Sequence, residues 1–111
     1  MSVMFPITQE EQASWQRRAA AELVVILEAH RDLPVIAWTV GPAGSTLAGR
    51  VDALESKEQV RAVFHCWRSA LALAEHSETM VWSGTCYLRA VGCRARVRLA
   101  LTATIDAEDL A

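Results

Sequence analysis

Residues 93–105 read CRARVRLALTATI, with arginine at positions 94, 96 and 98 and an apolar residue at every odd position. Such alternation is typical of a β-strand that has one face in the core and the other in solvent, because successive side chains point to opposite faces. The odd positions therefore predict a buried strand face. The arginines are predicted to lie on the opposite face.

The residues just before this stretch supply a strand that can pair with it. Apolar residues occupy the even positions of residues 79–90, and Val91-Gly92 has the composition of a turn. We therefore expect a long hairpin of residues 79–90 and 93–105.

The two apolar sets also suggest a register. If Arg89 pairs with Arg94, Cys86 faces Val97 on the core side and no bulge is needed. A three-residue connection would shift the register by one residue and place apolar side chains opposite arginines, so we disfavour it.

Two amphipathic helices and an earlier hairpin precede this pair of strands. Apolar residues at helical spacing predict helices over residues 8–30 and 56–76. A Gly/Pro turn at 41–44 predicts a hairpin of residues 33–41 and 44–52. Both helices begin with the spacing of a capping box, Thr8 with Glu11 and Ser56 with Gln59.

The order of elements is therefore αββαββ in a chain of 111 residues, a length typical of one domain. We expect a single α+β domain over residues 1–111, with a four-stranded antiparallel sheet and both helices packed on one face. Residues 1–7 form an N-terminal arm and residues 106–111 an acidic C-terminal tail.

The second face of this sheet is left open, because the sequence contains no third helix to cover it. An open face of threonine, small apolar residues and arginine is either solvent surface or a docking surface for a second subunit or a ligand. The residues that we single out as a candidate binding surface are Thr85, Tyr87, Arg89, Arg94, Arg96 and Arg98.

Charge is unevenly distributed along the chain. The formal net charge is −2, yet residues 84–105 carry four arginines and no acid, and residues 106–111 carry three acids. Arginines on neighbouring strands repel one another unless an anionic group pairs with them. This anionic group could belong to the acidic tail, to a second subunit or to nucleic acid, and Tyr87 could stack on a base. The remaining alternative is that the arginines have no partner and simply cover a solvated strand face.

Three functions remain open at this stage. The leading hypothesis is a small non-enzymatic binding module, homodimeric through its open sheet face or a sheet edge. The first alternative is a nucleic-acid-binding accessory protein that uses the arginine-rich hairpin. The second is a small-molecule-binding protein or enzyme with a pocket between sheet and helices, near Cys66 and Cys86.

Catalytic and metal signatures are weak. The adjacent His65 and Cys66 project about 100° apart on a helix, and we find no third polar group to orient the histidine. The potential zinc ligands have no CxxC or HxxxH spacing, so we predict no catalytic residue, no metal and no cofactor; these ligands are His65, Cys66, His76, Cys86 and Cys93. The tryptophans all fall on inward positions and predict core packing: Trp15, Trp38, Trp67 and Trp82.

Targeting features point to the cytoplasm. The apolar runs are far shorter than the roughly 20 residues that span a bilayer, and the N-terminus lacks the pattern of a secretory signal. Three cysteines without paired spacing are typical of reduced thiols. We therefore expect a cytoplasmic protein without a membrane partner.

Three segments carry a resemblance: LPVIAWTVGPAGSTLAGRV (33–51), VRAVFHCWRSAL (60–71) and YLRAVGCRARVRLALTATI (87–105). They resemble small proteins of unknown role from high-GC actinobacteria. The resemblance covers about residues 33–105 and implies a bacterial, cytoplasmic setting. It implies no catalytic residues.

Overall fold

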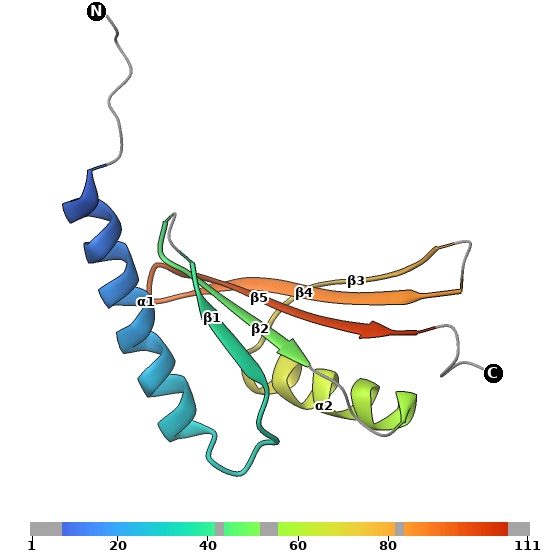
Figure 1. Cartoon of the computed structure of the whole chain (residues 1–111). Coiled ribbons are helices and arrows are strands. Elements are labelled where there is room, and N and C mark those ends of the chain that lie inside the picture. The colour runs from blue at the N-terminus through green and yellow to red at the C-terminus, as the bar shows by residue number, and fades with distance from the viewer. Residues whose placement is uncertain (1–7, 42–43, 52–55, 82–83, 107–111) are drawn as a thin grey trace, which may run out of the picture.

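The computed structural model describes residues 8–41, 44–51, 56–81 and 84–106 and shows an α+β fold with two helices and a five-stranded mixed sheet (Figure 1). The strand order is β1-β2-β5-β4-β3, and only β2 and β5 are parallel neighbours. The elements are α1 (Gln9–Ala29), β1 (Ala37–Val40), β2 (Thr46–Val51), α2 (Lys57–Ala70), β3 (Glu75–Met80), β4 (Cys86–Arg94) and β5 (Val97–Ile105).

Both helices begin where the capping residues predict. The Thr8 hydroxyl accepts a hydrogen bond from the Glu11 backbone N–H at 3.0 Å. Ser56 and Gln59 form a complete capping box, in which each side chain accepts a hydrogen bond from the other's backbone N–H, at 3.2 and 3.3 Å. The second helix ends at Ala70, six residues before the predicted end at residue 76.

The core lies between the helices and one face of the sheet. The odd positions of β5 from Val97 to Ile105 are all buried, which confirms the predicted alternation for these residues. The prediction is wrong for Cys93 and Ala95, which are exposed because they lie in β4 and in the turn. The matching positions of β4 are also buried, and they are Cys86, Leu88 and Ala90. The helices contribute Ala19 and Ile26 from α1 and Val60, Phe64 and Trp67 from α2.

Tryptophan side chains fill the core beneath β1. Trp67 is buried, its indole N–H donates to the Pro34 carbonyl at 2.7 Å, and Trp38 packs edge-to-face on it with ring centroids 5.5 Å apart. A Cβ on Gly49 would lie 3.1 Å from the Trp38 ring, so this glycine provides the space for the indole. Trp15 is only half-buried, and Trp82 lies outside the described residues.

The prediction of a four-stranded antiparallel sheet is wrong in two respects. The chain forms a fifth strand, β3, at the sheet edge, where we expected the end of a helix, a loop and the first residues of the strand 79–90. That predicted strand is divided between β3, in which Met80 is exposed, and β4. All six residues of β3 are exposed, so the segment has no apolar alternation that would identify it. The sheet is also mixed, because β2 pairs in parallel with β5, from Thr46 opposite Arg98 to Val51 opposite Ala103.

The predicted turn at Val91-Gly92 is also wrong. The chain turns at Ala95-Arg96, whose φ angles of 50° and 66° are both positive, as a two-residue type I′ hairpin requires. Arg89 therefore pairs with Thr102 rather than with Arg94. The observed register pairs nine residues on each strand and removes the cross-strand arginine pair, which is the physical reason to prefer it.

Gly92 has a packing role within β4 instead of a role in a turn. A Cβ at this position would lie 2.9 Å from the Leu73 Cδ2 atom. The glycine thus lets the segment after α2 cross close to the sheet.

Candidate binding site on the open sheet face

Both helices pack against the same side of the sheet, and no helix of the described part of the chain covers the opposite face (Figure 1). This confirms the arrangement of two helices on one face that the sequence predicted. The uncovered side is called the open face below, and it is formed by the outward residues of β2, β5, β4 and β3.

The strand register aligns the side chains of the open face in rows that run across the strands. Neighbouring rows are two residues apart along each strand, or roughly 6.6 Å. The four rows are Thr46–Arg98–Cys93, Ala48–Ala100–Val91–Glu75, Arg50–Thr102–Arg89–Ser77 and Thr104–Tyr87–Thr79.

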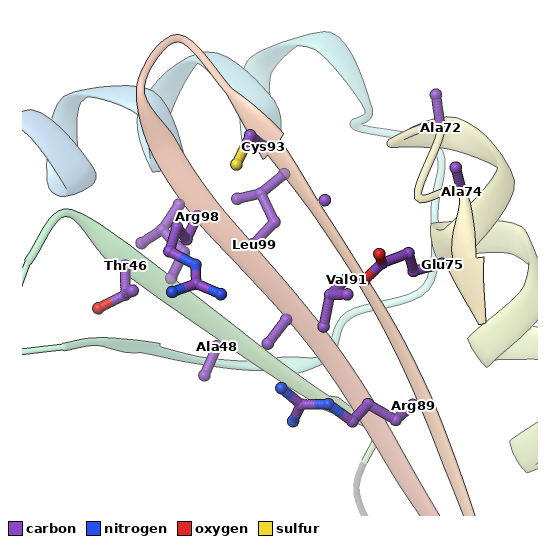
Figure 2. A pocket seen from close by; sticks show the side chains of 13 residues that line it. Thr46, Ala48, Ala72, Ala74, Glu75, Arg89, Val91, Cys93, Arg98 and Leu99 are labelled. Atoms are coloured by element: carbon purple, nitrogen blue, oxygen red, sulfur yellow. The ribbon is translucent and has the colours of Figure 1, made fainter. Parts of the chain in front are cut away.

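A groove of about 610 Å³ lies over the first three of these rows. Its floor is formed by the small side chains of Ala48, Ala100 and Val91. Arg98 stands one row to one side of this floor and Arg89 one row to the other side. Figure 2 shows both guanidinium groups extending into the space near Ala48.

The described lining of the groove has an excess of positive charge, with two arginines and one glutamate. Within the described residues, no carboxylate forms an ion pair with Arg89 or Arg98. Glu75 is the acidic residue that lines the groove, and it lies beside Val91 at the β3 border (Figure 2). An anionic group over the alanine floor would therefore lie within reach of two arginine side chains.

The other two arginines of the predicted surface lie elsewhere. Arg94 is on the helix side of β4, where its Nε donates to the Glu22 Oε2 atom of α1 at 2.6 Å. Arg96 is exposed in the turn between β4 and β5. The cause is the turn position, because it assigns Arg94 to β4, whose even positions face the helices, and Arg98 to β5, whose even positions face outward.

The remaining predicted site residues lie at the far end of the open face. Tyr87 belongs to the last row, opposite Thr104, and is 47% exposed. Thr85 precedes β4 and is half-buried, and its carbonyl accepts a hydrogen bond from the Val81 N–H at 3.0 Å. The structure thus brings Tyr87, Arg89 and Arg98 onto one face.

Sequence reasoning misplaced several residues that line the groove. Ala74 was assigned to the buried side of a helix and Cys93 to the core face of a strand. Val91 was assigned to a turn, and Glu75 was placed at the end of a helix. Neither residue lies in an alternating pattern, so their place on the open face follows only from the observed register.

The histidines and cysteines do not form a reactive centre in the described residues. The rings of His65 and His76 lie 5.5 Å apart, and desolvation together with His76 lowers the pKa of His65. Cys86 is fully buried, and burial raises the pKa of its thiol, which disfavours the nucleophilic thiolate. Cys66 and Cys93 are exposed free thiols.

No group of three or more potential metal ligands occurs in the described ranges. The same ranges hold no helix that is both long and apolar enough to cross a membrane.

Comparison of the chain with protein-family models, with curated proteins and with solved structures found no match in any of the three. The resemblance of residues 33–105 to actinobacterial proteins therefore stays a prediction.

Proposed function

We propose that this protein is a small non-enzymatic binding module of the bacterial cytoplasm whose open sheet face holds an acidic partner. The observation that carries the proposal is the groove on this face, in which Arg89 and Arg98 flank a floor of small apolar side chains and form no ion pair with a carboxylate of the described residues. Charge-assisted hydrogen bonds from arginine to carboxylate are among the stronger polar contacts, and the guanidinium geometry suits them.

The charge of the groove favours an acidic partner over a second copy on the same face. Two open faces packed together would bring Arg89 and Arg98 near the same residues of the other copy. Glu75 is the single acid lining the described groove, so in each copy it alone would have to compensate the charges of Arg89 and Arg98. A partner with several carboxylates can pair with both arginines and adds no positive charge that would repel them.

The distribution of charge also favours an acidic protein segment over nucleic acid. Arg94 is engaged with Glu22 and Arg96 lies in the turn, so neither adds to the charge of the groove. The chain has a pI near 5.9, whereas nucleic-acid-binding domains are commonly strongly basic. The feature that supports the nucleic-acid alternative is Tyr87, which lies one row beyond Arg89 on the same face and could stack on a base.

A labelled polyglutamate peptide tests the proposal by fluorescence anisotropy at low salt. Loss of one charge-assisted hydrogen bond corresponds to about a tenfold loss of affinity, so we expect Arg89→Ala and Arg98→Ala each to weaken binding by about that factor. Arg96→Ala is the matched control, since it removes an exposed arginine outside the groove, and we expect it to bind the peptide with nearly unchanged affinity.

Two outcomes would overturn the proposal. One is an affinity for polyglutamate that is the same for the wild type, Arg89→Ala and Arg98→Ala. The other is tight, strongly salt-dependent binding of single-stranded DNA that outcompetes the peptide, which would support the nucleic-acid alternative.

A further inference from the structure

Helix α1 has an apolar surface that faces away from the rest of the molecule. Residues 19–27 read AAAELVVIL, and their one charged side chain, Glu22, points inward to pair with Arg94. Only Ala19 and Ile26 of the described helix are fully buried, whereas Val24 is 59% and Leu27 44% exposed. A helix segment that is apolar on all sides is normally buried on all sides.

Three exposed apolar side chains of α1 form one stripe. Ala20, Val24 and Leu27 recur at spacings of four and three residues, which places them on one side of the helix. This side is turned by about 100–160° around the helix axis from Ile26, which is buried. In Figure 1 the helix lies at the border of the molecule, with β1 and β2 on its inner side.

The stripe ends in opposite charges. Arg17 lies at its N-terminal end and has no ion-pair partner in the described residues, and Glu28 lies at its C-terminal end. Glu28 is 60% exposed and pairs with Arg31, which lies in the turn just after the helix, and this leaves room for a second cation. The two charges are three turns apart on the same side, with only apolar residues of the stripe between them.

We propose that the outer stripe of α1 is the self-association surface, and that it packs antiparallel against α1 of a second copy. A twofold axis near the middle of the helix places Ala20 against Val24 of the second copy, and the small alanine permits close helix packing. The same axis brings Arg17 beside Glu28 of the second copy at both ends. This interface is on the helix side of the sheet, so the open-face groove stays accessible.

A matched pair of substitutions tests this surface by light scattering at high protein concentration. We expect a dimer for the wild type, a monomer for Val24→Glu and a dimer for Val25→Glu. Val25 is a suitable control because it is 49% exposed but projects about 100° away from Val24. Far-ultraviolet circular dichroism confirms that each variant is folded.

Charge reversal tests the antiparallel arrangement with variants that change only exposed residues. Arg17→Glu and Glu28→Arg should each weaken the dimer, and the double variant should restore it. A monomeric wild type, or equal dimerisation of Val24→Glu and Val25→Glu, would overturn the interface. Failure of the double variant to recover dimerisation would overturn the antiparallel packing.

Discussion

The contact between Arg94 and Glu22 gives a quantitative test of the claim that Arg94 stabilises the fold, whereas Arg89 and Arg98 bind a partner. The two side chains join the β4 end of the hairpin to α1, with a distance of 2.6 Å from Nε to Oε2. The Glu22 side chain is only 12% exposed and that of Arg94 35%. Arg94→Met would keep much of the aliphatic packing but leave the carboxylate of Glu22 without its partner.

The expected cost follows from the partial burial of the pair. At an effective dielectric constant of about 20, unit charges about 4 Å apart attract by about 4 kcal/mol, and desolvation and side-chain ordering offset much of this. Hydrogen bonds to charged groups contribute about 1.5–3 kcal/mol. Because Arg94 is partly exposed, we expect Arg94→Met to lower the free energy of unfolding by about 2 kcal/mol.

Urea denaturation of the double-mutant cycle isolates the interaction. Glu22→Gln and Arg94→Met should together cost less than the sum of the single variants, with a coupling free energy of about 1–2 kcal/mol. Arg96→Met should change the stability by less than about 0.5 kcal/mol, because it is a surface substitution. Additive costs in the cycle would refute the placement of Arg94 on the helix side.

Three further changes probe the two faces of the sheet and the histidine contact. Leu101→Ala should cost about 3 kcal/mol in urea denaturation because the side chain is 1% exposed, and a cost no greater than that of Ala100→Ser on the open face would contradict the assigned faces. Gly49→Val should cost about 1–3 kcal/mol and alter the near-ultraviolet circular dichroism of Trp38, whereas unchanged stability and spectrum would argue against the close packing there. The lowered pKa of His65 means that the unfolded chain binds a proton more readily, so stability should fall as pH drops through about 6.5. His65→Gln should reduce this dependence, and identical pH profiles of the two proteins would contradict it.

The sequence predicted the helix starts and the buried face of β5 well, because those depend on capping and periodicity. Thr8 and Ser56 marked the helix starts, and the alternation in residues 97–105 marked the core side of β5. Register depends instead on the turn. Ala95-Arg96 has no glycine or asparagine, the residues that usually adopt positive φ, so Val91-Gly92 was the more plausible turn on composition alone.

The error in the turn changed the predicted site more than the predicted core. Apolar pairs form in both registers, whereas Arg94 moves from the open face to the helix side. Local sequence patterns could not predict the edge strand β3, because all its residues are exposed. They also could not predict the parallel pairing of β2 with β5, because these strands are far apart in the chain. The groove floor depends on the parallel pairing, because Ala48 and Val91 are brought together only through β5.

The central claim is that Arg89 and Arg98 act together to bind an acidic partner on the open face. Nuclear magnetic resonance of the arginine Nε–H groups during titration with polyglutamate tests it most directly, because each side chain reports separately. We predict that the signals of Arg89 and Arg98 shift together with one affinity, while those of Arg94 and Arg96 stay nearly constant. Shifts led by Arg96, or no shift at Arg89 and Arg98 at saturating peptide, would contradict the account.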